Sequence, residues 1–268
     1  MFEGIRAVGF DLDNTFLRTH VDYGRIDRAD RDACIRHGIP FDDIEFKTIK
    51  RQRAPIREWL SVHGRYDEFD ALCKEIDEEL TAIELEHIDE AAALPGSLEC
   101  LDILRSKGLR VGLLTRGSYR YGDAALTMFG VRNKFDAIVG RDYGDYDDAK
   151  PSPKAMIYFA RELGVRPSEV LYLGDNVTDY YSARDAGAHF IGVLSGSMDE
   201  EKWMAEDPDM TVIRFAGDVI HLIRPLFLQY GTSVHPIEHG WVHDMLGLAD
   251  QSHGYFDGYR LKSGRRRL

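Results

Sequence analysis

From residue 94 to residue 228, short apolar segments alternate with amphipathic segments of helical periodicity. The apolar segments, which have the length of strands, are residues 109–114, 137–139, 170–173, 190–193 and 211–213. The helical segments are residues 97–107, 119–129, 153–163, 179–186 and 218–228. Glycines end most of these helices, as expected where the chain turns toward the next strand. This alternation predicts a parallel sheet with helices on both faces, an α/β fold of the Rossmann-like, doubly wound type.

The region between the first apolar segment and the rest has a different character. Residues 5–12 form an isolated strand-like segment, after which strands disappear until about residue 93. Helical spacing occupies residues 27–37, 43–50, 56–63 and 69–88. We therefore expect an all-helical cap inserted into the core. The expected division is a core of residues 1–17 and 94–229, a cap of residues 18–93 and an appendage of unknown role, residues 230–268.

The charge of the chain excludes some partners. Lys and Arg total 34 against 46 Asp and Glu, which gives a formal net charge of -12. Such a surface repels nucleic acid, and no basic stripe with interleaved aromatic residues argues otherwise, so we expect no nucleic-acid partner. An anionic substrate would also be repelled. Its site must therefore supply local positive charge from a metal ion or from arginines.

The cysteines and the apolar runs indicate the compartment. Cys34, Cys73 and Cys100 are odd in number and form no C-x-x-C pair, which is typical of free thiols in a reducing compartment. The first residues lack the blocks of a signal peptide, and no apolar run approaches the ~20 residues that span a bilayer. We expect a cytoplasmic protein with no membrane partner.

The first strand-like segment ends in a cluster of acids. Alternate residues of an extended chain share a face, so Asp11 and Asp13 are expected to point the same way. Two like charges at close range are costly unless a cation or a proton lies between them. Carboxylates are hard oxygen ligands, which favours magnesium over a soft metal.

Three other segments place polar residues near the predicted carboxyl ends of strands, the edge where ligands bind in open α/β sheets. Thr115 can hold phosphate oxygens through its hydroxyl, and Lys150 can neutralise a phosphoryl group. Asp175 and Asp179 follow a strand and open a helix, where a second carboxylate would complete a magnesium site. Each segment alone is more often a turn, a helix cap or solvated surface. Their conjunction, in this order, reverses that preference.

The four segments together resemble the motifs of the haloacid dehalogenase-like hydrolases. The matching sequences are Asp-Leu-Asp-Asn-Thr from Asp11, Leu-Leu-Thr ending at Thr115, Lys-Pro-Ser-Pro from Lys150, and Gly-Asp at Asp175 together with Asp179. The resemblance covers residues 1–229 or so. It is greatest to the subgroup with a helical cap after the first strand, which includes phosphoglycolate phosphatases and β-phosphoglucomutases.

The resemblance implies a magnesium-dependent phosphatase. Asp11 would attack phosphorus and form an aspartyl-phosphate, while Asp13 would protonate the leaving group and then activate water. Mg²⁺ would be held by Asp11, by the backbone carbonyl of Asp13 and by Asp175. Asp179 would act beside the metal or through water and would help to position Lys150. The phosphoryl oxygens would be bound by Thr115 and Lys150.

One position departs from the family pattern. Members usually carry Asn after the Thr or Ser of the second motif, whereas this chain has Arg116. An arginine there could point to solvent or reach the substrate, so its role stays open. The departure puts the substrate in doubt and leaves the reaction class unaffected.

The expected cap carries a basic cluster within an acidic chain. Residues 47–65 contain six basic residues and the single acid Glu58, a local net charge of +5 (six minus one). The basic residues are Lys47, Lys50, Arg51, Arg53, Arg57 and Arg65. One interpretation is that some of them, notably Arg51 and Arg53, bind an anionic tail of the substrate. The alternative is a solvated face paired with nearby acids such as Asp43 and Glu45. The substrate class expected is a small phosphorylated, anionic metabolite. Phosphoglycolate or a sugar phosphate would fit, and so would a nucleotide or pyrophosphate.

The appendage has its own pattern. His235, His239 and His243 recur at intervals of four, a spacing that gathers ligands on one helical face. Pro236 and Gly240 argue against a regular helix there, so a second metal site is not favoured. Aromatic residues of the segment could dock it onto the core or onto a second subunit, which allows a homodimer.

Other functions are weighed on the same residues. A dehalogenase or a phosphonate hydrolase of this family would lack the second acid of the first motif, so Asp13 favours phosphoryl chemistry. A sugar-phosphate mutase keeps all four motifs and is an alternative that sequence separates poorly from a phosphatase. A non-catalytic binding protein on the same fold is a further alternative. The presence of every motif acid argues against it.

Overall fold

The computed structural model describes residues 4–45 and 52–223. Its main feature is a six-stranded sheet in the order β5-β4-β1-β6-β7-β8, with every neighbouring pair parallel. The strands are β1 (Ala7–Phe10), β4 (Arg110–Leu114), β5 (Ala137–Val139), β6 (Val170–Gly174), β7 (His189–Val193) and β8 (Val212–Ile213). The chain order reverses around β1, which lies in the middle of the sheet. The predicted fold class is confirmed.

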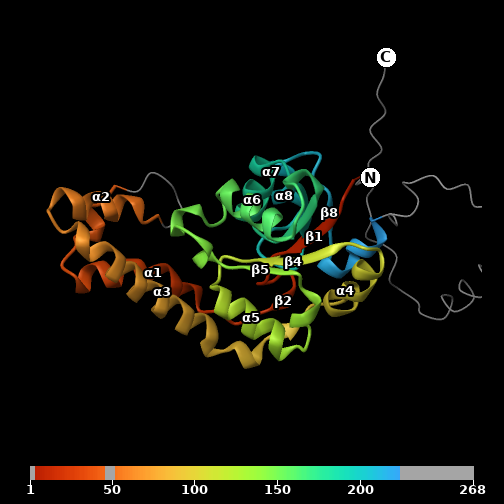
Figure 1. The fold of residues 1–268 in the computed structure, drawn as a ribbon, viewed down its shortest axis with the longest axis horizontal. Coiled ribbons are helices and arrows are strands. Elements are labelled where there is room, and N and C mark those ends of the chain that lie inside the picture. Colours follow the sequence, from red (N-terminus) through yellow and green to blue (C-terminus); the bar gives the residue numbers. More distant parts are fainter. Residues whose placement is uncertain (1–3, 46–51, 224–268) are drawn as a thin grey trace, which may run out of the picture. The chain divides into compact units, whose positions relative to one another are not determined.

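Helices cover both faces of this sheet (Figure 1). On one face lie α4 (Ser97–Ser106) and α5 (Tyr119–Met128). On the other lie α6 (Pro153–Glu162), α7 (Val177–Ala186) and α8 (Glu200–Glu206). The sequence did not predict α8. The helix expected over residues 218–228 is a 3-10 helix, η8 (Ala216–His221), in its described part. None of the helices in the described ranges is both long and apolar enough to cross a membrane.

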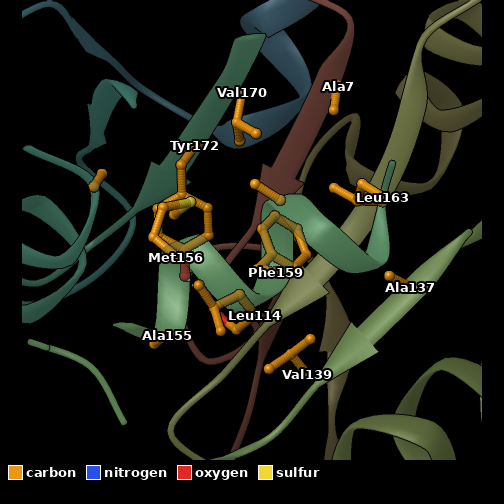
Figure 2. Close-up of a cluster of buried hydrophobic side chains, with 12 residues drawn as sticks. Ala7, Leu114, Ala137, Val139, Ala155, Met156, Phe159, Leu163, Val170 and Tyr172 are labelled. Atoms are coloured by element: carbon orange, nitrogen blue, oxygen red, sulfur yellow. Dashed lines mark hydrogen bonds between the residues drawn. The ribbon is translucent and has the colours of Figure 1, made fainter. Parts of the chain in front are cut away.

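Glycines in the central strands make room for one aromatic ring. Gly9 of β1 and Gly112 of β4 are register partners, and α6 places Phe159 over both. A Cβ atom would lie 2.6 Å from the Phe159 ring at Gly9 and 2.5 Å from it at Gly112. Phe159 is fully buried in a cluster with Met156 of the same helix and side chains of four strands (Figure 2). These glycines therefore let α6 approach the sheet closely.

The insert is helical and has its own core. It contains α1 (Tyr23–Arg36), α2 (Ala54–Val62) and α3 (Phe69–Glu86), and α1 and α3 pack side by side (Figure 1). Leucine and isoleucine side chains from all three helices form one buried cluster. The helix expected over residues 43–50 is corrected where it is described: η1 (Phe41–Asp43) is a single 3-10 turn, and Ile44 and Glu45 are not helical.

The expectation that strands disappear from the insert is also corrected. Strand β2 (Leu17–Arg18) pairs antiparallel with β3 (Ala92–Ala93) at the junction of insert and core. The sequence predicted neither strand, because each is short and directly adjoins segments of helical spacing. Because the pairing brings the two ends of the insert together, it supports our proposed boundaries near residues 17 and 94. The remaining short elements are η2 (Tyr66–Glu68), η3 (Ile88–Glu90), η4 (Arg132–Lys134), η5 (Arg141–Tyr143), η6 (Tyr146–Asp148) and η7 (Pro167–Glu169).

Two other predictions concern single residues. Cys34, Cys73 and Cys100 are free, as expected, and the first and last of them are buried. The appendage of residues 230–268, with His235, His239 and His243, lies outside the described residues.

The packing of Phe159 against the sheet yields a test of the core. We expect Gly112→Ala to lower the free energy of unfolding by about 1–3 kcal/mol, because the added methyl group overlaps a fully buried ring. Urea denaturation followed by circular dichroism measures this. Gly144→Ala is the control, since a Cβ there meets no atom within 4 Å, and it should change the value by less than about 0.5 kcal/mol. Equal midpoints for the two variants would contradict the packing argument.

Candidate active site

Neighbouring strands bring the motif residues to one edge of the sheet. Phe10 is in register with Leu113 on one side and with Leu173 on the other, so the residues after β1, β4 and β6 end side by side. A cleft of about 400 Å³ opens at this edge, between the core and the insert. The core residues Asp11, Asp13, Asn14, Arg116, Gly117, Arg141, Tyr146, Lys150, Asp175, Asn176, Thr178, Asp179 and Ser197 line it. The insert contributes Val21, Tyr23, Ile26, Asp27, Leu80 and Glu84.

Lys150 is buried at the centre of the motif residues. Its ammonium nitrogen lies 2.7 Å from Oδ1 of Asp11 and 2.5 Å from Oδ1 of Asp179. It also contacts the Leu114 carbonyl at 2.9 Å and the Tyr172 hydroxyl at 2.8 Å. The Lys150 side chain is 1% exposed. A charge so deeply buried is tolerable only with such partners, and the two carboxylates raise the pKa of Lys150 against the effect of its burial.

Three buried carboxylates lie close together here, and the ammonium of Lys150 contacts two of them, Asp11 and Asp179. Asp11, Asp175 and Asp179 each offer an oxygen, and these oxygens lie within 4.8 Å of one another. Burial raises the pKa of Asp11 well above its ordinary value, with Lys150 opposing the shift. Burial, and then the charge of Asp179, raise the pKa of Asp175 to about 7. The cluster therefore has an excess of negative charge and hard oxygen donors, which is the environment that a divalent cation such as Mg²⁺ stabilises.

Asp13 is held in a different environment from Asp11. Its Oδ1 accepts hydrogen bonds from the hydroxyl of Thr19 at 2.6 Å and from the hydroxyl of Tyr121 at 2.7 Å. Desolvation raises the pKa of Asp13, while these two hydrogen bonds oppose the shift. Asn14, the next residue, has a positive φ of 57°, a conformation that turns the chain away after the acids. Sequence analysis missed Thr19 and Tyr121, since neither belongs to a motif.

Thr115 ends up behind the wall of the cleft. It is 2% exposed, and its hydroxyl oxygen accepts a hydrogen bond from the Gly117 N–H at 2.9 Å. The residues that line the cleft are the next two, Arg116 and Gly117. Phosphate binding by Thr115 therefore stays a prediction. Arg116 lines the cleft, and its contact with a substrate stays a prediction.

Arg53 does not line the cleft; its side chain is buried among other residues of the protein. Its guanidinium donates to Asp30 at 3.2 Å and to Asp77 at 2.9 Å, and it stacks on the Tyr146 ring at 3.9 Å. The Arg53 side chain is 2% exposed and lies between two acids of the insert and the Tyr146 ring of the core. We therefore assign Arg53 to the stability of the insert and not to the substrate.

Two other basic residues of the cluster also form ion pairs with acids. Arg57 pairs with Asp145, and Arg65 pairs with Glu68. The alternative of pairing with acids describes these residues better, although the acids differ from those expected. Arg51, Lys47 and Lys50 lie outside the described residues.

A segment after β7 completes the surroundings of Asp175. The N–H of Ser197 donates to Oδ2 of Asp175 at 3.1 Å, and the Ser197 hydroxyl donates to the Asp175 carbonyl at 3.1 Å. A Cβ atom on Gly196 would lie 1.9 Å from Oδ2 of Asp175, so only glycine fits there. Sequence reasoning missed this segment. Its signal was a polar Ser-Gly-Ser run after an apolar strand, the same arrangement as in the four motifs.

Comparisons with known proteins identify the family of the chain. Residues 5–187 match a family model of hydrolases, the haloacid dehalogenase-like hydrolase model. N-acetylmuramic acid 6-phosphate phosphatase of Pseudomonas aeruginosa is 28% identical over 206 residues, which cover 74% of this chain and 85% of that protein. Phosphoglycolate phosphatase of Yersinia pseudotuberculosis is 27% identical over 219 residues, which cover 80% and 92%.

Solved structures give the same fold. The structure of a hydrolase from Pseudomonas syringae matches with a TM-score of 0.55 at 20% identity, covering 84% of this chain and 99% of that one. The chain belongs to the haloacid dehalogenase-like hydrolase family, because the family model spans more than half of it. Within that family it is a phosphatase, as its motifs predicted.

The environment of Arg53 yields a test of its assignment. We expect Arg53→Ala to lower the free energy of unfolding by about 3–5 kcal/mol, because it leaves the Asp30 carboxylate buried without its partner. Arg57→Ala breaks a pair that is more than a third exposed and should change the value by less than about 1 kcal/mol. Urea denaturation measures both. A stable Arg53→Ala protein with impaired substrate binding would return Arg53 to the site.

Proposed function

We propose that this phosphatase hydrolyses small phosphomonoesters in two steps, through a phosphoryl group carried on Asp11, with Mg²⁺ bound. The observation that carries the proposal is the environment of Asp11. This carboxylate lies at the end of the central strand and contacts Lys150, and it shares one cleft with Asp13 and a cluster of further acids. No other acid of the cleft combines these features in the described part of the chain.

In the first step Asp11 is the nucleophile. Lys150 donates to Oδ1 of Asp11, and Oδ2 accepts no hydrogen bond from the described residues. Oδ2 is thus the oxygen that forms the new bond to phosphorus while the bond from phosphorus to the leaving oxygen breaks. Lys150 opposes the effect of burial on Asp11 and so favours its charged form, and it stabilises the negative charge that the phosphoryl oxygens bring.

Asp13 supplies and then removes the proton. Desolvation raises its pKa and so favours the protonated carboxyl that a general acid requires. Both hydrogen bonds from Thr19 and Tyr121 go to Oδ1, so they fix the carboxyl group and leave Oδ2 for the proton. In the second step the carboxylate takes a proton from water, whose oxygen bonds to phosphorus as the bond to Asp11 breaks.

The acid cluster fits a magnesium ion. Asp11 and Asp175 would be its carboxylate ligands, together with the carbonyl of Asp13, and Asp179 lies close enough to act directly or through water. When bound, Mg²⁺ screens the repulsion between these acids and polarises the phosphoryl oxygens. Ser197 holds Asp175 in place for this role, and Lys150 holds Asp179.

The residues that line the cleft indicate which substrates it can bind. The insert presents the apolar Val21, Ile26 and Leu80, the phenol of Tyr23, and two acids. Lys150 and Arg141 are paired with carboxylates, whereas Arg116 makes no ion pair within the described residues. These features support a small leaving group with one further anionic group beside Arg116, such as the carboxylate of phosphoglycolate.

The roles of the two acids give a kinetic test. With magnesium and p-nitrophenyl phosphate, Asp11→Asn should lower kcat by at least about 10³-fold, because the nucleophile is lost. Asp13→Asn should release one equivalent of nitrophenol and then stall, because a good leaving group needs no acid whereas water still needs a base. Stopped-flow absorbance measures the burst, and the mass of the intact enzyme measures the trapped phosphoryl group. Asp102→Asn, an exposed acid paired with Lys134, is the control and should behave like the wild type.

The outcomes separate the alternatives. Phosphate release by Asp11→Asn at the wild-type rate would contradict the proposed nucleophile. A wild-type protein that isomerises a sugar monophosphate faster than it releases phosphate would be a mutase. Folded protein with magnesium that acts on no phosphomonoester would be a binding protein.

The place of Arg116 predicts a difference between substrates. Arg116→Ala should raise KM about tenfold for phosphoglycolate and clearly less for p-nitrophenyl phosphate, since only the former carries a second anion for the guanidinium to bind. Arg120→Ala, which removes an exposed arginine four residues on and outside the cleft lining, is the control. Equal changes in KM for both substrates would show that Arg116 does not bind the second anionic group of the leaving group.

A further inference from the structure

A buried ion pair joins the insert to the core in the wall of the cleft. Glu84 lies in the last turn of α3, and Arg141 begins η5, shortly after β5. One guanidinium nitrogen of Arg141 donates to Oε1 of Glu84. The side chains are 3% exposed for Arg141 and 7% for Glu84, and both residues line the cleft. Neither belongs to a family motif, and sequence analysis singled out neither.

The other carboxylate oxygen of Glu84 holds the loop that follows β4. Oε2 accepts hydrogen bonds from the N–H and from the hydroxyl of Ser118, both at 3.1 Å. Ser118 ends the loop of residues 115–118, which we call the phosphate loop because it begins with Thr115, the residue that the second motif predicts to bind phosphate. From the opposite side, the backbone N–H of Arg141 donates to the Gly117 carbonyl at 2.9 Å. The phosphate loop is therefore held between the insert and the core segment at Arg141.

The guanidinium of Arg141 also fixes how α3 lies against this loop. Nη2 donates to the Thr81 hydroxyl at 3.1 Å and to the Asp77 carbonyl at 3.3 Å, one and two turns before Glu84. Nη1 reaches the Arg116 carbonyl at 3.5 Å as well as Glu84. A single planar side chain thus contacts two turns of a helix in the insert and the loop in the core.

Such a buried ion pair contributes little net free energy to folding, because the desolvation of its two charges offsets their attraction. Removing both charges from water is expensive, and well-packed apolar side chains of similar size are often at least as stable. Burial raises the pKa of Glu84, which reflects this cost, while Arg141 and Ser118 oppose the shift. The best-attested benefit of a buried ion pair is that it specifies one arrangement among several. Here the arrangement specified is that of α3 on the phosphate loop.

A second ion pair between insert and core provides a contrast. Arg57 of α2 pairs with Asp145, with side chains 35% and 39% exposed. This pair touches no residue of the phosphate loop. It can therefore report what an insert–core contact does for the protein when the loop is not involved.

We propose that Glu84 and Arg141 are positioning residues, which couple the seating of α3 on the core to the geometry of the phosphate loop. With Glu84 in place, both polar hydrogens of Ser118 are directed to its carboxylate, and the loop keeps the form described above. Without Glu84, the Ser118 side chain retains only its capping bond from the Tyr121 N–H at 3.2 Å. The proposal rests on the proposed function and on the predicted binding of phosphate by Thr115 at the start of this loop.

The test compares Glu84→Gln and Arg141→Lys with Arg57→Gln. Two quantities are measured with magnesium present: hydrogen–deuterium exchange of peptides covering residues 115–122, and the Kd of inorganic phosphate by calorimetry. We expect the first two variants to exchange faster in these peptides and to bind phosphate about fivefold or more weakly. Arg57→Gln should leave both quantities at their wild-type values. Should Glu84→Gln not fold, Thr81→Val removes one acceptor of Arg141 and should give smaller changes in the same direction.

The opposite result is equally clear. If folded Glu84→Gln and Arg141→Lys keep wild-type exchange and wild-type phosphate affinity, the pair only holds the insert to the core and the proposal is wrong. Failure of the proposed function is a separate outcome, because it appears as a wild-type protein that releases phosphate from no phosphomonoester. Exchange in residues 115–122 still decides the coupling of α3 to the loop in that case.

Discussion

The buried ammonium of Lys150 is the interaction on which the site depends. It lies between Asp11 from the central strand and Asp179 from α7, and it reaches them from the loop that leads to α6. Three separate parts of the chain must therefore be in place before any of these charges is balanced. Removal of one partner would leave the others as uncompensated buried charges, which is among the most destabilising changes a protein can undergo. The contacts of Lys150 that stabilise the fold are therefore also the contacts that arrange the site.

Polar contacts near the cleft join the insert to the core. Asp147 accepts hydrogen bonds from the N–H groups of Arg53 and Ala54 at the start of α2, at 2.7 and 2.8 Å. Together with the pair of Glu84 and Arg141, this places charged groups of one core segment against two helices of the insert. That segment runs directly into Lys150. The position of the insert and the position of Lys150 are thus linked through a short stretch of backbone.

Sequence patterns predicted the elements of the core because their signals are local. Strands of four or five apolar residues and helices closed by glycines can be recognised without knowing their neighbours. The two-residue strands β2 and β3 carry no such signal, since only their pairing defines them. Arg53 shows the same limit for a side chain. Its charge suggested a substrate contact, whereas its burial beside Asp30 and Asp77 depends on how α1 and α3 pack.

The sequence by itself determined the fold class, the family and the residues that the four motifs supply, because each motif is a short run at the end of a recognisable strand. Only the tertiary structure decided which other residues complete the site. Tyr121 and Ser197 reach Asp13 and Asp175 from elements more than twenty residues away, and Arg141 meets Glu84 across the junction of core and insert. Strand order and helix packing determine which of these residues meet. Both are properties of the whole fold, so the sequence next to each residue does not reveal its partner.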